Sequence, residues 1–234
     1  TTKLNTKSRI IASSGVFQIE LLEHVGKEDY PALFSISEHL AKEYGKKAVL
    51  SKATIQKYFN KPGSLPFIAR YRGDIIGYII GILLEELSHE PWARTDENFG
   101  KGNTLYTYAF VIISQYKGCG YAKMLKRVYL NWAKKRESVR YISGHVKIGV
   151  SANFTGDIKI INRVENWRDT GKTFEYYRRD LDPEQIHTLK KNPPLKVSKF
   201  QKQIFLFSFE PKKDSELCSF WEELRTQIFF FEIY

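Results

Sequence analysis

The stretch SQYKGCGYAKML, Ser114 to Leu125, contains two glycines, Gly118 and Gly120, separated by one residue. The apolar run TLYTYAFVII precedes it and predicts a β-strand that is central in its sheet. The pattern that follows predicts an amphipathic helix with a basic outer side. Glycines at such a junction let backbone N–H groups turn toward a ligand, and a helix start favours an anion by about 0.3–1 kcal/mol. The stretch therefore predicts a phosphate-binding turn.

Two common phosphate-binding loops do not fit this stretch. A Walker A loop fails because Lys and Ser/Thr do not follow a second glycine at the required spacing. A Rossmann fingerprint requires a third glycine where Lys123 stands, and a parallel βαβ unit rather than the antiparallel hairpin predicted upstream. A tight turn without a ligand and a different anion-binding motif both remain open on the residues of the turn alone.

The elements around the turn predict a mixed α and β domain. The hairpin turns at Arg72-Gly73, and Pro31 and Gly45 mark the start and end of the first helix. We expect strands at 16–22, 66–71, 74–86, 104–113, 141–146 and 173–181, and helices at 29–45, 52–59, 121–135 and 157–165.

Gln115-Tyr116-Lys117-Gly118-Cys119-Gly120 resembles the Q/R-x-x-G-x-G/A acyl-CoA motif of the GNAT superfamily of N-acyltransferases, and the element order over residues 16–181 is similar to that fold. The resemblance implies an α+β (three-layer α/β) fold: a mixed, mostly antiparallel central sheet flanked by helices. It also implies transfer of an acetyl group from acetyl-CoA, the co-substrate, to a primary amine by direct attack. No metal is expected.

The resemblance implies a place for coenzyme A. Its pyrophosphate would lie on the backbone amides of Tyr116 to Tyr121, and its pantetheine arm along the central strand near Phe110 to Ile112. Lysines of the turn and helix could meet a phosphate or could form a solvated helix face. The expected cofactor-binding residues are Phe110, Val111, Ile112, Gln115, Tyr116, Lys117, Gly118, Cys119, Gly120, Tyr121, Lys123 and Asn153.

The second half departs from the family pattern. Many relatives have an Asn, then a helix with a Tyr that protonates the leaving thiolate, then Gly-Phe. Here Asn153 matches the Asn, but Asn162 stands where the Tyr would fall and Asn166-Trp167 near the Gly-Phe position. The general acid is therefore not assigned by the resemblance.

Direct attack requires a neutral amine, and removing the proton of a lysine-like ammonium at pH 7 costs roughly 4–5 kcal/mol. Glu85 and Glu86, expected to end a hairpin strand with one side chain on each face, are candidates for the base, with a charged strand end as the alternative. Tyr176 and Tyr177, on opposite faces of the last strand, are candidates for the acid or for packing. Cys119 has no catalytic neighbour in sequence and is expected to be inert.

The sequence predicts four parts. We expect a flexible tail at 1–15, the GNAT-like acyltransferase domain at 16–189, a linker at 190–196 around Pro193 and Pro194, and a C-terminal αβ extension at 197–234 packed on the main domain. The formal net charge of +11 favours an anionic partner. The alternative function is a basic module with this fold that binds nucleic acid or protein through Lys190, Lys191, Lys196, Lys199 and Lys202.

Composition excludes several classes of protein. No apolar run approaches the roughly 18 residues of a membrane span, and two cysteines cannot form a disulfide framework, so a cytoplasmic location is expected. The segment 85–97 reverses the overall charge with five acids against Arg94. It is a candidate acidic rim for a cationic amine, or only a solvated loop. The acceptor, small molecule or protein, and the oligomeric state are not specified.

Overall fold

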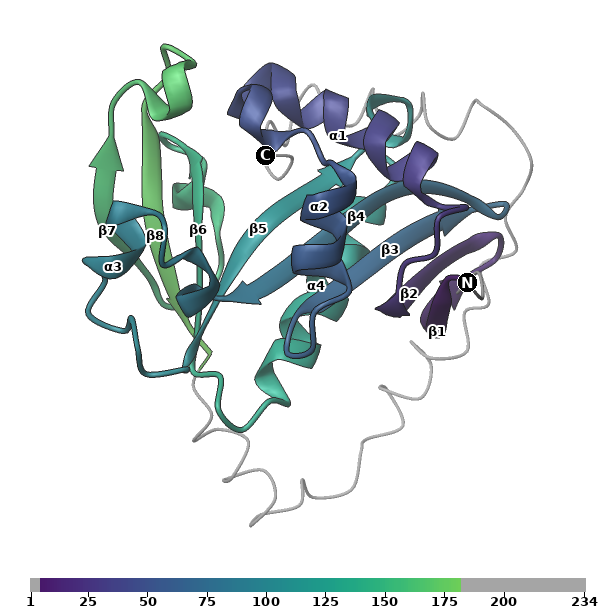
Figure 1. Ribbon diagram of the computed structural model, residues 1–234, viewed down its shortest axis with the longest axis horizontal. Helices are drawn as coiled ribbons and strands as arrows, with labels where there is room; N and C mark the ends of the chain where they lie inside the picture. The colour runs from purple at the N-terminus through teal and green to yellow at the C-terminus, as the bar shows by residue number, and fades with distance from the viewer. Residues whose placement is uncertain (1–4, 182–234) are drawn as a thin grey trace, which may run out of the picture.

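The computed structural model describes residues 5–181, which form an eight-stranded sheet of order β1-β2-β3-β4-β5-β6-β8-β7 (Figure 1). All neighbouring strands are antiparallel except β5 and β6. This is the mixed, mostly antiparallel sheet that the sequence predicts. The strands are β1 (Lys7–Ser14), β2 (Phe17–His24), β3 (Leu65–Tyr71), β4 (Asp74–Leu83), β5 (Thr104–Ile112), β6 (Tyr141–Lys147), β7 (Ile158–Val164) and β8 (Phe174–Asp180).

Helices cover both faces of the sheet. On one face lie α1 (Tyr30–Tyr44) and α2 (Lys52–Thr54), the latter continuing as a π-helical turn over Ile55–Phe59; on the other lies α4 (Tyr121–Lys134) (Figure 1). The short α3 (Pro91–Arg94) precedes β5. Each face has its own apolar core: Leu33 and Ile36 of α1 belong to one, and Leu125 and Tyr129 of α4 belong to the other.

The sheet opens between β5 and β6. β5 pairs with β4 from Leu105 to Ile112, but with β6 only from Thr104 to Tyr106. Beyond Tyr106 the two strands diverge (Figure 1). Tyr108 is an extra residue between Thr107 and Ala109 in the pairing with β4, so a β-bulge lies where the strands part. Residues 107–110 of this central strand are only half-buried, which marks a wedge-shaped gap in the sheet.

Three expectations about elements are wrong. Residues 7–14, expected within a flexible tail, form β1, because their backbone completes a ladder with β2 and Ser8 donates to Glu20 (2.8 Å). Residues 157–165, expected as a helix, contain the edge strand β7, which pairs with β8. Glu85 and Glu86 lie in a 3₁₀ turn, Leu84–Leu87, after β4 has ended.

Residues 182–189 of the expected domain, the linker at 190–196 and the extension at 197–234 lie outside the described residues, as do Cys218 and the lysines of the alternative binding module. Over the part of the chain that is described, no helix is long and apolar enough to span a bilayer.

Candidate active site

The glycine turn connects β5 to α4 through a 3₁₀ turn at Ser114–Tyr116. Gly118 (φ 91°) and Gly120 (φ 79°) are both left-handed, a conformation that other residues adopt only with strain. Gly120 is the N-cap of α4, and the helix start has neither a side-chain cap nor an acidic residue in its first turn. A β-carbon at Gly120 would meet no atom of residues 5–181 within 4 Å. The helix start therefore faces open space, as an anion cradle requires.

The two tyrosines of the turn are committed to packing. Tyr121 stacks on Phe17 with ring centroids 4.2 Å apart, and Tyr116 lies 5.2 Å from Tyr71. Their side chains pack against the core beneath α4. The Tyr116 amide donates to the Ile113 carbonyl oxygen (3.0 Å), so it does not face a ligand. Cys119 is partly exposed and Lys123 exposed.

A groove extends from the turn along β5 under the C-terminal half of α1. Ser114, Lys117 and Ala122 line its end at the turn, and Phe110, Val111 and Ile112 line its β5 side. His39, Leu40, Lys42 and Tyr44 of α1 form the opposite wall. Sequence reasoning missed His39 and Lys42; their i, i+3 spacing on the polar side of α1 was the available signal. The groove brings Lys117 and Lys42 together, as a phosphate site would.

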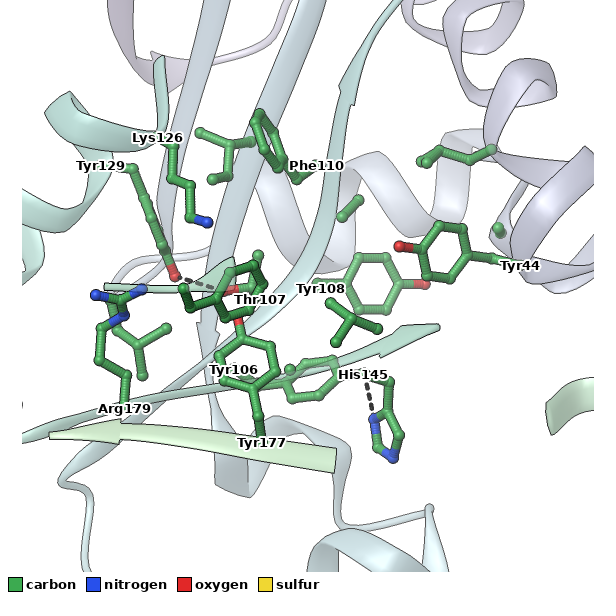
Figure 2. A pocket seen from close by; sticks show the side chains of 18 of the residues that line it. Tyr44, Tyr106, Thr107, Tyr108, Phe110, Lys126, Tyr129, His145, Tyr177 and Arg179 are labelled. Carbon is green, nitrogen blue, oxygen red and sulfur yellow. Dashed lines mark hydrogen bonds between the residues drawn. The ribbon is translucent and has the colours of Figure 1, made fainter. Parts of the chain in front are cut away.

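The groove continues into a pocket in the wedge between β5 and β6, since Leu40, Tyr44 and Phe110 line both. The pocket has about 900 Å³ of empty space, counting solvent at its mouth. Figure 2 shows side chains from α1, β5, α4, β6 and β8 converging on it. Its polar and charged lining residues are Tyr44, Tyr106, Thr107, Tyr108, Lys126, Tyr129, His145, Arg168, Tyr177 and Arg179.

Three hydroxyl groups meet at the bulge. Thr107 Oγ1 lies 3.2 Å from the Tyr129 hydroxyl. Burial raises the pKa of Tyr177, although Arg179 and a hydrogen bond with Thr107 oppose that shift. Two glycines make room for the rings: a β-carbon at Gly81 would lie 2.5 Å from Tyr129 Oη, and one at Gly144 3.1 Å from the Tyr177 ring. We call Thr107, Tyr129 and Tyr177 the hydroxyl cluster.

His145 lies on β6 where that strand leaves β5. Its Nδ1 is 3.0 Å from the Tyr106 hydroxyl, and its ring stacks on Trp167 at 3.9 Å and on Tyr176 at 4.8 Å. Burial, with a smaller contribution from the Arg168 charge, lowers the pKa of His145 to about 3. The imidazole is therefore neutral at physiological pH and is a weak base.

The β7–β8 turn closes the pocket. Asn166, Arg168 and Asp169 have positive φ values of 48°, 48° and 60°, a cluster of strained residues of the kind found near functional sites. The turn buries Trp167 and places Arg168 on the pocket wall. Arg168 Nη2 lies 3.5 Å from Glu90 Oε1. The turn also abuts the end of α1, where a β-carbon on Gly45 would lie 3.1 Å from the Arg168 carbonyl oxygen.

Neither predicted base lines the pocket. Glu85 Oε1 accepts hydrogen bonds from the amides of Gly100 and Gly102, both at 2.9 Å, and Glu86 pairs with Lys61. Both side chains therefore bind neighbouring loops. β4 ends at Leu83, so neither glutamate lies on the strand, and neither reaches the wedge.

The two predicted tyrosines separate as their positions on opposite faces require. Tyr177 lines the pocket, whereas the Tyr176 hydroxyl donates to Asp96 Oδ2 (2.7 Å) on the other face. Burial raises the pKa of Tyr176. Asn153 follows β6, and its amide lies 3.4 Å from the Val150 carbonyl oxygen; it does not line the wedge pocket.

The acids of segment 85–97 are engaged within the protein. Asp96, 6% exposed, receives hydrogen bonds from Tyr176 and from Arg178 Nη2 (2.8 Å), and Arg178 also pairs with Glu97. Burial opposes ionisation of Asp96, but the bonds from Asn98, Tyr176 and Arg178 outweigh it and hold the pKa of this carboxyl below its ordinary value. Glu90 likewise pairs with Arg168. These acids therefore do not form the open acidic rim that was a candidate site for a cationic amine.

Comparison with known protein families agrees with the fold and with the glycine turn described above. A family model described as "Acetyltransferase (GNAT) family" matches residues 30–151, which contain the turn, the groove and most of the wedge. The chain belongs to this family. No curated protein sequence matches this chain significantly.

Solved structures share the fold at low sequence identity. The ribosomal-protein-S18-alanine N-acetyltransferase from Escherichia coli is 13% identical with a TM-score of 0.50, covering 70% of this chain and 94% of its own. Arabidopsis thaliana Naa50 in complex with the bisubstrate analogue CoA-Ac-MVNAL is 13% identical (TM-score 0.51, 70% and 99% covered). An uncharacterized protein from Bacillus halodurans is 14% identical (TM-score 0.52, 81% and 98% covered). Family membership supports acyl transfer in general. Over residues 5–181 no cluster of three metal-ligating side chains occurs.

Proposed function

We propose that this GNAT protein transfers an acetyl group from acetyl-CoA to a primary amine by direct attack. The observation that carries the proposal is one continuous path: the glycine turn at one end, the groove along β5, and the wedge pocket at the other end. From Thr107 to Ile113 the strand advances roughly 20 Å at about 3.3 Å per residue, a span comparable with an extended pantetheine arm. An acyl-CoA of this shape would place its phosphates at the turn and its thioester at the bulge.

The residues present fit coenzyme A. Amides of 118–121, the start of α4 and the cations Lys117 and Lys42 suit the phosphates. The amides of Tyr116 and Lys117, also expected there, already donate to the carbonyl oxygens of Ile113 and Ser114 (both 3.0 Å). Within residues 5–181, the edge of β5 that faces β6 has no strand partner beyond Tyr106, so its backbone around Phe110 to Ile112 can bind an extended arm as a strand would. Of the other expected residues, Gln115, Lys123 and Asn153 remain predictions without a contact that supports them.

When bound, acetyl-CoA supplies the activated acetyl group. The attacking nitrogen forms a bond to the carbonyl carbon, the carbon–sulfur bond breaks, and the nitrogen loses the proton that the departing sulfur gains. The hydroxyl cluster lies at the bulge where that sulfur is expected, and Tyr177 and Tyr129 can each donate a hydrogen bond to it. Tyr177 is thus our candidate for the acid that the family motif leaves unassigned. Tyr176 is not, because its hydroxyl is held by Asp96.

The experiment is release of free thiol from acetyl-CoA in the presence of a panel of primary amines, with mass spectrometry of the products. Amine-dependent release supports the proposal, and binding of acetyl-CoA without release would leave a binding module of the same fold. Acetyl-CoA compared with longer acyl-CoA substrates tests the acyl group. With only two cysteines in the chain, we also infer a reducing compartment such as the cytoplasm.

A further inference from the structure

The hydroxyl cluster lies where two glycines leave space beside β5. Thr107 pairs with Gly81 of β4, and a β-carbon on Gly81 would lie 2.5 Å from Tyr129 Oη. Gly144 of β6 follows the last residue of the β5–β6 ladder, and a β-carbon there would lie 3.2 Å from Tyr177 Oη. Figure 2 shows both tyrosine side chains directed toward Thr107. Each neighbouring strand thus contributes a glycine that lets one tyrosine hydroxyl approach Thr107.

Thr107 forms hydrogen bonds with both tyrosines. Its Oγ1 lies 3.2 Å from the Tyr129 hydroxyl, and either group can donate. Burial raises the pKa of Tyr129 and of Tyr177, and a hydrogen bond with Thr107 opposes that rise at each. A threonine hydroxyl has one proton and two lone pairs. Thr107 therefore donates to one tyrosine at a time and accepts from the other.

The three protons can be arranged in two orders. If Tyr177 donates to Thr107 and Thr107 to Tyr129, the proton of Tyr129 has no further partner within residues 5–181. Tyr129 is 1% exposed, and a buried donor without an acceptor costs free energy. If Tyr129 donates to Thr107 and Thr107 to Tyr177, both protons are bonded and that of Tyr177 stays free. The second order is therefore favoured.

The free proton of this order lies on the open side of β5. Tyr177 pairs with Gly144, which lies just past the point where β6 leaves β5. The Tyr129 hydroxyl instead lies against Gly81 on β4, where the sheet is closed. The chain of hydroxyl groups thus runs from the closed side of β5 to the wedge.

From this arrangement we infer that Thr107 is a positioning residue, which holds the Tyr177 hydroxyl with its proton directed at the departing sulfur while Tyr129 holds Thr107. The inference rests on the proposed acetyl transfer and adds two residues to its acid. As the carbon–sulfur bond breaks, the Tyr177 O–H bond breaks and the proton joins the sulfur. Thr107 donates to the oxygen that is left negative, and the bond from Tyr129 strengthens that donor. The proton lost by the nitrogen then restores the Tyr177 hydroxyl.

The first test removes the Thr107 hydroxyl and then returns it. Thr107→Val keeps the branched shape, and we expect kcat to fall about fivefold while KM for acetyl-CoA stays within about twofold. Thr107→Ser restores a hydroxyl and should return kcat to within about twofold of wild type. Thr104→Val is the matched control on the same strand, because the Thr104 hydroxyl donates to Asn103 Oδ1 (2.9 Å) and not to the cluster. It should leave kcat unchanged.

The second test asks whether Thr107 acts through Tyr177. If it does, Thr107→Val with Tyr177→Phe should be within about twofold of Tyr177→Phe alone, because the hydroxyl that Thr107 holds is already gone. A merely structural effect of Thr107→Val would multiply with the loss in Tyr177→Phe to about 50-fold. Tyr129→Phe should lower kcat about threefold in wild type and not at all in Thr107→Val or Tyr177→Phe.

The assay is thiol release from acetyl-CoA with the most reactive amine of the panel, run on the full chain. Wild-type kcat in Thr107→Val, a Thr107→Ser variant no faster than Thr107→Val, or losses that multiply would overturn this inference and leave acetyl transfer standing. If Thr107→Val does not fold, the pair Tyr129→Phe and Tyr177→Phe decides by the same rule. Thiol release with no amine in wild type would overturn both proposals.

Discussion

The segment 85–97 and the turn 114–121 are both polar connections beside β5, and the structure uses them in opposite ways. The acids of the first bind partners inside the protein: Asp96 and Glu97 with Arg178, Glu90 with Arg168, and Glu85 with two loop amides. The turn has a left-handed glycine at an uncapped helix start that faces open space. Polar groups with internal partners stabilise the fold, whereas those directed at open space can bind a ligand.

The largest effect is expected at the turn. Gly118→Val or Gly120→Val should abolish the rise in melting temperature caused by acetyl-CoA, because a side chain strains either left-handed residue and, at Gly120, also fills the space beside the helix start. Gly73→Val is the matched control, since Gly73 has a φ of 92° and open space but lies in the β3–β4 hairpin. An unchanged shift in both turn variants would show that acetyl-CoA binds elsewhere.

Substitutions of the paired acids in segment 85–97 should change stability and leave acetyl-CoA binding unchanged. Asp96→Asn leaves Arg178, itself 6% exposed, without its buried partner and should cost about 3 kcal/mol, or roughly 6–12 °C in melting temperature. Acetyl-CoA should still raise the melting temperature of this variant by the wild-type amount. Loss of that rise would place Asp96 in the binding site.

The buried imidazole beside the pocket predicts a pH dependence. Between the unfolded pKa of 6.5 and the folded pKa of about 3, the unfolded chain binds the His145 proton and the folded one does not. Stability is therefore lost as pH falls through this window, at up to about 1.4 kcal/mol per pH unit, or about 2 kcal/mol from pH 7 to pH 5. Chemical denaturation at the two pH values should show this loss in wild type and a smaller one in His145→Phe. Equal losses would mean that His145 is protonated in the folded protein.

Tyr177 and Tyr176 are adjacent in sequence, but we expect their substitution to have different effects, one on catalysis and one on stability. Tyr177→Phe removes a hydroxyl from the pocket and should lower kcat about 10-fold at unchanged KM for acetyl-CoA. Tyr176→Phe removes a bond to Asp96 and should cost about 1 kcal/mol of stability with kcat within threefold. The reverse assignment of effects would move the candidate acid to Tyr176.

The smallest effect is expected at the exposed end of the acidic segment. The Glu97 side chain is 66% exposed, so its pair with Arg178 should contribute less than about 1 kcal/mol. Glu97→Gln should change neither the acceptor KM nor its salt dependence. A several-fold rise in KM that grows at low salt would restore the acidic rim predicted from composition.

The turn, the helix after it and most of the sheet could be predicted from the sequence because each has a local cause. The left-handed glycines stand at the end of an apolar run, and Leu33, Ile36 and Leu40 follow a helical period. β1 and β7 could not be predicted. Edge strands bury few side chains, so their sequences need not alternate between apolar and polar residues: Ile10 is 55% exposed and Ile160 is 36% exposed.

The site was less predictable because its members meet only through the fold. Lys42 of α1 reaches the groove, and Arg168 reaches the pocket, through contacts far apart in sequence. The roles expected for Glu85 and Glu86 depended on an assumed strand length, and β4 stops at Leu83. The sequence therefore showed which residues are charged, but not which of them form ion pairs or hydrogen bonds inside the protein.

The short junction of β5 and β6 has a mechanical consequence. In the described part of the chain, three ladder pairs, from Thr104↔Tyr141 to Tyr106↔Ser143, connect strands β1–β5 to strands β6–β8 within the sheet. An acyl-CoA lying in the gap would act as a splint between two half-sheets that otherwise share a narrow seam. Backbone amides of β6 and β8 should then exchange with deuterium more slowly in the complex, even where the ligand does not touch them.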